Sequence, residues 1–236
     1  PGGSPRVAVP MKAVGRAVRP VGGALAVRGA GPAGQASGRG AGQPSGAQAG
    51  ASAAPQAAPL SSADKAWLEK IEQALNRSPT FQARIQQIDA NNRRTTGTVW
   101  MKRPGQMRLA YDAPSPLLLV ATDGKVVFRD NQLDQTTVIP MERTPLGLLL
   151  RSHVSLSDDV TVTDFQHAQG FVQVTLTRTS SPGDGTLTLV FYEKPLALRS
   201  WSVVDAQGRQ TQVTLFDVRE GGDLPASLFV PPADPQ

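Results

Sequence analysis

The first periodic pattern along the chain is a helical repeat of apolar side chains that begins just after Leu60. Ser61 and Asp64 have the spacing of a capping box, in which each side chain accepts a hydrogen bond from the backbone N–H of the other residue. The repeat ends before Pro79. The pattern therefore predicts one amphipathic helix whose apolar face carries Trp67, Leu68, Ile71, Ala74 and Leu75.

After Pro79 the apolar period changes from about 3.6 residues to 2, which is the period of β-strands. Strand-like runs begin with Phe81 to Ile85, Val99 to Met101 and Met107 to Tyr111, and further runs lie at about 160–166, 170–178, 186–192, 196–204 and 209–218. Short turns such as Asp123-Gly124 separate them, and short connections imply antiparallel neighbours. The sequence predicts an α+β, mainly β fold: one helix followed by a long antiparallel meander.

A leucine-rich segment, Thr144 to Arg151, interrupts this meander. Thr144 suits a helix N-cap and Pro145 suits the first helical position. Gly147 inside the segment costs about 1 kcal/mol relative to alanine, so a helix here is stable only when it packs on the sheet. We therefore expect a short apolar helix that serves as a removable cover.

The composition divides the chain into two parts. Residues 1–59 contain 13 Gly, 16 Ala and 8 Pro, and such a segment cannot bury enough apolar surface to fold. We expect residues 1–59 to be a disordered basic tail and residues 60–236 to be one folded domain. Val21 to Val27 is too short and too rich in glycine for the apolar core of a signal peptide, and no apolar run approaches the roughly 18 residues of a membrane span.

The net charge of +5 lies in the tail and not in the domain. Residues 1–63 carry six basic residues and no acidic residue, which leaves residues 64–236 with a net charge of −1. A nucleic-acid-binding domain concentrates positive charge on its folded face. We therefore expect no nucleic-acid partner.

The residue types needed for catalysis or metal binding are sparse. The two histidines, His153 and His167, have no acid or cysteine at metal-ligand spacing, and we expect both to be solvated loop residues. The adjacent Asp158 and Asp159 would point to opposite faces of a strand. The chain has no cysteine, which excludes disulfides and thiol catalysis. We expect a protein that is not an enzyme, with no cofactor and no metal site.

The remaining feature is the apolar face of the expected sheet, and it has two interpretations. If the two helices do not fill its concavity, the remaining space is an apolar pocket of the size of a lipid site. If they do fill it, the face is an ordinary packed core, which is the commoner meaning of alternating apolar residues.

The order of several short motifs from Leu60 onward resembles the LolA family of periplasmic lipoprotein carriers. The motifs are Gly97-x-Val99-Trp100-x-Lys102-Arg103-Pro104-Gly105, Tyr111-Asp112-x-Pro114, Leu133-x-Gln135, Thr144-Pro145-Leu146, Asp205-x-x-Gly208-x-x-Thr211 and Phe229-x-x-Pro232. The resemblance implies an incomplete antiparallel β-barrel, with helices that cover its concave apolar face. It also implies a periplasmic location.

The resemblance implies a role as well. LolA proteins bind lipoprotein acyl chains and carry them from an inner-membrane ABC transporter to an outer-membrane receptor or to the outer membrane itself. The alternatives on the same fold are a lipid or lipoprotein sensor and a glycolipid carrier. We expect the carrier to act as a monomer.

The resemblance assigns roles to individual residues. It implies that Arg103 is a latch for the lid, and that Met107 is a contact for the transporter. The lid helix would carry Leu146, Leu148, Leu149 and Leu150, and candidates for the cavity wall are Phe81, Ile85, Val99, Met101, Leu109, Leu118, Phe128, Leu189, Phe191 and Trp201. Arg108 is expected to be a solvated strand residue.

Overall fold

The computed structural model describes residues 54–232, which form one long sheet with a single α-helix. The elements in chain order are α1 (Ser62–Asn76), β1 (Thr80–Ile88), β2 (Arg94–Lys102), β3 (Gln106–Tyr111), β4 (Leu117–Thr122), β5 (Lys125–Asp130), β6 (Gln135–Pro140), η1 (Met141–Arg143), η2 (Pro145–Leu150), β7 (Val160–Ala168), β8 (Phe171–Arg178), η3 (Pro182–Asp184), β9 (Gly185–Tyr192), β10 (Ala197–Asp205), β11 (Gln210–Glu220) and η4 (Ala226–Phe229). The η elements are 3-10 helices.

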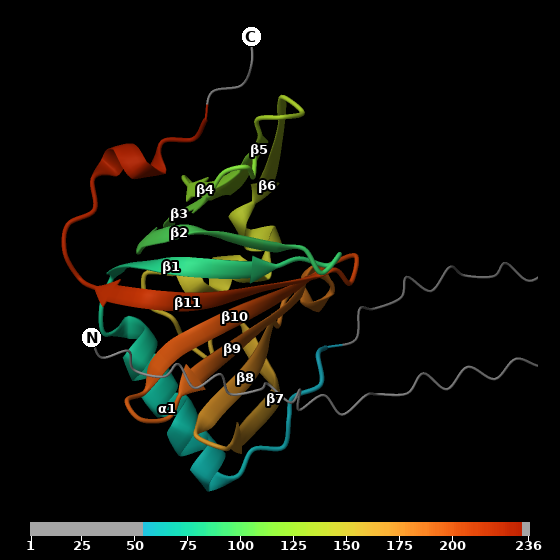
Figure 1. Cartoon of the computed structure of the whole chain (residues 1–236). Coiled ribbons are helices and arrows are strands. Elements are labelled where there is room, and N and C mark those ends of the chain that lie inside the picture. The colour runs from blue at the N-terminus through green and yellow to red at the C-terminus, as the bar shows by residue number, and fades with distance from the viewer. Residues whose placement is uncertain (1–53, 233–236) are drawn as a thin grey trace, which may run out of the picture. The chain divides into compact units, whose positions relative to one another are not determined.

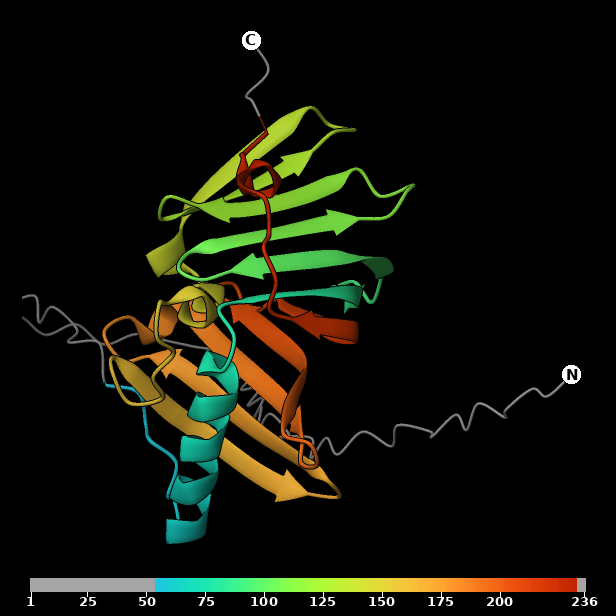
Figure 2. The same cartoon turned by 90° about the vertical axis from the view of Figure 1, so that its left-hand side faces the viewer.

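All eleven strands belong to one antiparallel sheet in the order β6-β5-β4-β3-β2-β1-β11-β10-β9-β8-β7. Strands that are consecutive in the chain are neighbours, except that β6 and β7 lie at the two edges of the sheet. The pairing of β1 with β11 joins the two halves of the meander. The sheet curves strongly without closing, so it is the predicted incomplete barrel (Figures 1 and 2). We call its inner surface, which carries Val99, Leu109 and Leu189, the concave face.

Helix α1 has the predicted capping box. The Asp64 N–H donates to Ser61 Oγ at 3.1 Å, and the Ser61 N–H donates to Asp64 Oδ2 at 3.0 Å. Figure 2 shows α1 in front of the lower strands, β7 to β10. Its buried residues, Ile71 and Leu75, join the core of the concave face. The pattern at the start of the domain therefore specified both the helix and its inward side.

The segment at 144–151 is helical, but it is a 3-10 helix instead of an α-helix. Thr144 is the N-cap, although its side chain makes no capping hydrogen bond. All six residues of η2 are buried, so packing stabilises it more than local hydrogen bonds do. A Cβ at Gly147 would lie 2.4 Å from the Met141 carbonyl oxygen, and this close approach explains the glycine.

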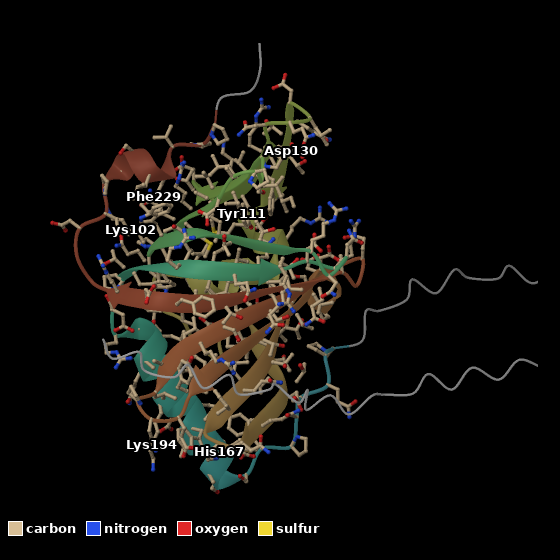
Figure 3. All side chains as sticks on the ribbon, in the orientation of Figure 1. Lys102, Tyr111, Asp130, His167, Lys194 and Phe229 are labelled. Carbon is tan, nitrogen blue, oxygen red and sulfur yellow. The ribbon has the colours of Figure 1, made fainter. Side chains whose placement is uncertain are left out.

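The C-terminal segment covers the convex side of β3 and β4, an element that the strand pattern did not predict. Phe229 of η4 is buried there, where η4 contacts β3 and β4, and Figure 3 shows it beside these strands. Arg108 donates from Nη1 to the Leu228 carbonyl oxygen at 3.2 Å. The expectation that Arg108 is merely solvated was therefore wrong, because its partner lies 120 positions along the chain.

The predicted tail at 1–59 lies almost entirely outside the described residues. Near its end, the Ala58 N–H donates to the Val162 carbonyl oxygen of β7 at 2.8 Å. Among residues 54–232, no helix is long and apolar enough to cross a membrane.

Candidate functional site

Arg103 lies in the turn between β2 and β3, and only 8% of it is exposed. Its Nε donates to the carbonyl oxygen of Leu149 in η2 at 2.8 Å, and its Nη1 donates to the carbonyl oxygen of Leu75 in α1. One guanidinium thus joins the β2–β3 turn, α1 and η2, as its rigid fork of donors allows. Burial lowers the pKa of Arg103 from its usual value, but an arginine remains charged at any physiological pH.

We call η2 the lid. The turn between β2 and β3 makes a second contact with it. The Gly105 N–H donates to the Leu150 carbonyl oxygen at 2.7 Å. The leucines of the lid, Leu146, Leu148, Leu149 and Leu150, are all buried. The lid lies against β8, β9 and β10. Helix α1 lies in front of the same part of the sheet (Figure 2).

A second clamp holds the loop that follows the lid, and sequence reasoning missed it. The Asn76 side chain donates from Nδ2 to the Val154 carbonyl oxygen and accepts from the Val154 N–H, both at 2.8 Å. One turn earlier, the Glu72 carboxylate accepts from the Leu156 N–H at 2.6 Å. These partners lie 78 and 84 positions apart, so no local pattern could reveal them.

The structure brings most of the predicted wall residues together. A buried set on the concave face consists of Ile85, Val99, Met101, Leu109, Leu189, Phe191 and Trp201. Phe81 is partly buried against them. Met107 lies between Met101 and Ala121 on the same face and is fully buried, so a partner could reach it only after the cover moves.

Two predicted wall residues differ from this set. Leu118 lies on the convex side, because the register places Leu119 and not Leu118 beside Leu109. The run from Leu117 to Val120 is apolar at every position, so its sequence gave no sign of which side chains face inward. Phe128 does lie on the concave face beside Leu119, yet 39% of it is exposed.

A pocket of 380 Å³ opens beside the C-terminal end of α1. Three predicted residues, Phe81, Phe191 and Arg103, line it together with residues at the ends of β9, β10 and β11. The concave side is therefore packed over most of its area and hollow at this rim. The sequence left open whether this face is a packed core or an apolar pocket, and the structure has a packed core with a pocket at its edge.

The comparisons with known proteins agree with this geometry. The family model of the outer membrane lipoprotein carrier protein LolA matches residues 76–232. The chain belongs to the LolA family. An outer-membrane lipoprotein carrier protein of Pseudomonas paraeruginosa is 29% identical over 181 residues, which cover 72% of this chain and 86% of the relative. One from Methylococcus capsulatus is 28% identical over 184 residues, covering 73% and 88%.

Solved structures with a similar fold include the LolA superfamily protein NE2245 from Nitrosomonas europaea. It is 9% identical, has a TM-score of 0.40, and is matched over 70% of this chain and 96% of its own. A crystal structure of MucB is 13% identical with a TM-score of 0.41, over 75% and 66% of the two chains.

His167 is exposed, as the sequence suggested, but it lies in β7 and not in a loop. Its ring lies 4.7 Å from the ring of Trp67 in α1, and its Nε2 lies 3.3 Å from Glu193 Oε2. Figure 3 shows it at the end of β7 beside α1. Among residues 54–232, no three His, Cys, Asp or Glu side chains are grouped so that they could hold a metal.

Two ionisable side chains beside β2 have strongly shifted pKa values. The hydrogen bond and ion pair with Arg84, helped by Thr96, lower the pKa of Asp112 to about 2. Burial raises the pKa of Tyr111 to about 12, although its hydroxyl donates to Gln87 Oε1 at 2.6 Å. Both groups have clear structural partners, and neither lies in the pocket.

Proposed function

We propose that this protein is a periplasmic carrier that binds the acyl chains of lipoproteins on its concave face. The observation that supports this most strongly is the Arg103 contact. A single buried cation holds both covers, α1 and the lid, over an apolar surface by hydrogen bonds to backbone carbonyls. The lid contributes no strand to the sheet, so in this proposal it can move without breaking the pairing of the strands.

The driving force for binding is burial of hydrocarbon. Each CH₂ group that leaves water contributes about 0.8 kcal/mol, so an acyl chain can offset the loss of the lid contacts. Transfer to the outer membrane, or to a receptor there, needs no nucleotide on this protein when the acceptor binds the chains more tightly. In this proposal an inner-membrane ABC transporter supplies the lipoprotein, and the carrier acts as a monomer.

The proposal is tested with the purified protein and an environment-sensitive apolar dye. We expect the dye to bind with a defined stoichiometry and a purified lipoprotein to displace it. The same lipoprotein without its acyl chains is the matched control, and it should not displace the dye. Displacement by both forms, or by neither, would contradict the proposed cargo.

A further inference from the structure

The pocket beside α1 has both exposed side chains and buried core residues in its wall. Its volume of 380 Å³ lies in the lower part of the range of about 300–1,000 Å³ for small-ligand sites. Leu75, Phe191 and Leu215 line it and are buried core residues. An apolar molecule in this pocket would therefore touch the core of the concave face directly.

The mouth of the pocket exposes large apolar side chains. Tyr192, Phe216 and Val218 all line it, and each is between 43% and 47% exposed. Phe216 and Val218 flank Asp217, which has a positive φ of 51° at a register shift between β1 and β11. Exposed apolar side chains that gather at a hollow indicate a binding site better than scattered ones do.

An arginine at the end of α1 spans this mouth. Arg77 is the C-cap of α1, and its Nε lies 3.5 Å from Glu220 Oε2 at the end of β11. Its Nη2 donates to the Leu196 carbonyl oxygen in the β9–β10 turn at 3.3 Å. Lys194, which is labelled in Figure 3, belongs to this turn and lies beside α1. Both partners of the ion pair are about half exposed, and such pairs contribute little to stability, so the contact opens easily.

The pocket also reaches the latch of the lid. Arg103, whose Nε holds the Leu149 carbonyl oxygen, is one of its lining residues. Leu75, whose carbonyl oxygen accepts from Arg103, is another. A molecule that fills the pocket therefore contacts both partners of the bond between α1 and the β2–β3 turn.

We propose that this pocket is the entrance by which an acyl chain reaches the concave face, and that Arg77 is its gate. The inference rests on the proposed carrier function. The apolar floor suits the hydrocarbon, and the ionic rim formed by Arg77, Asp217 and Glu220 suits the polar end of a lipoprotein. A chain that enters here separates α1 from Arg103 and so frees one side of the guanidinium that also holds the lid at Leu149, which couples entry to loosening of the lid.

The site of entry is tested by photo-crosslinking with a synthetic triacylated lipopeptide. A photoreactive amino acid replaces Ala197 at the pocket, Phe128 at the exposed end of the concave face, or Ala168 at the far end of β7. We expect crosslinks to the lipopeptide from position 197 early in binding, and none from 168. Early crosslinks from 128 alone would overturn the entrance but leave the carrier function intact. No binding of the lipopeptide to the unmodified protein would contradict the function itself.

The gate is tested by the rate at which a fluorescent long-chain fatty acid binds. Arg77→Ala should bind the probe about twofold to fivefold faster than the unmodified protein, as expected for the loss of one exposed ion pair and its hydrogen bond. Arg94→Ala, at an exposed arginine that begins β2, is the control and should not change the rate. An unchanged rate in Arg77→Ala would remove Arg77 as a gate.

The entrance is also tested by filling it. Ala197→Trp places an indole at the mouth and should slow probe binding at least about tenfold, since the added side chain would fill much of a pocket of 380 Å³. Ala168→Trp adds the same side chain outside the pocket and should bind the probe normally. Normal binding by Ala197→Trp, with native circular dichroism, would place the entrance elsewhere.

Discussion

The two ends of the concave face have the same alternating pattern but different surroundings. Towards β7, the inward residues Val174, Leu189 and Phe191 lie under α1 and the lid and are almost completely buried. Towards β6, Leu117 and Phe128 face the same side and remain 40% and 39% exposed. The difference comes from the cover and not from the strands, so one sheet provides a packed end and an accessible end.

The largest change in the free energy of unfolding should come from truncating a core residue at the covered end. We expect Leu189→Ala to lower the free energy of unfolding by about 2–5 kcal/mol, because a cavity forms among side chains that cannot collapse. Chemical denaturation measures this change. A loss below about 1 kcal/mol would mean that the covered end is loosely packed and that the two ends do not differ in packing.

The alternation of apolar residues was sufficient to predict most of the strands, although not β6, since period 2 is a local property of the sequence. It also predicted the helix with its capping box and the short apolar segment at the lid. It could not predict which inward residues are covered. The cover of β9, which carries Leu189, comes from η2 and α1, which are distant in sequence (Figure 2), whereas Phe128 has no comparable neighbour in its own hairpin.

In the candidate site too, residues in a local motif could be predicted and residues with distant partners could not. The predicted role of Arg103 came from a local motif, Lys102-Arg103-Pro104-Gly105, that resembles the family. Asn76 carried no such signal, because an asparagine near the end of a helix is common and Val154 is far along the chain. Strand β6, with only Ile139 and Thr136 partly buried, was too polar to be recognised as a strand.

The second prediction removes the contact that holds the cover on the β7 end. Arg103→Leu leaves the carbonyl oxygens of Leu75 and Leu149 without this donor, which should destabilise the closed form by about 2–3 kcal/mol. We expect the variant to bind more apolar dye and to retain a bound lipoprotein in the presence of an acceptor.

The matched control is Arg103→Lys, which keeps the charge but loses the forked donor geometry. It should fall between the unmodified protein and Arg103→Leu in dye binding. If Arg103→Leu released lipoprotein to an acceptor as fast as the unmodified protein, the latch would lie elsewhere.

The third prediction concerns the Asn76 clamp, which holds the loop after the lid to the same helix. Asn76→Ala removes a donor and an acceptor from Val154 and should cost about 1–2 kcal/mol. Hydrogen exchange should show faster exchange at the Val154 and Leu156 amides, with β8 and β9 unchanged. Equal acceleration in those strands would mean that the clamp supports the whole fold instead of the cover.

The smallest effect on stability should come from the accessible end. Phe128→Ser should change the free energy of unfolding by no more than about 0.5 kcal/mol, because the side chain already lies partly in water. Its effect on dye binding separates two uses of this end. If the accessible end only extends the surface over which a bound chain lies, binding weakens slightly while the rate of entry is unchanged. If chains enter there, the rate of entry falls in Phe128→Ser and not in Ala197→Trp, and the exposed end of the concave face is then the entrance.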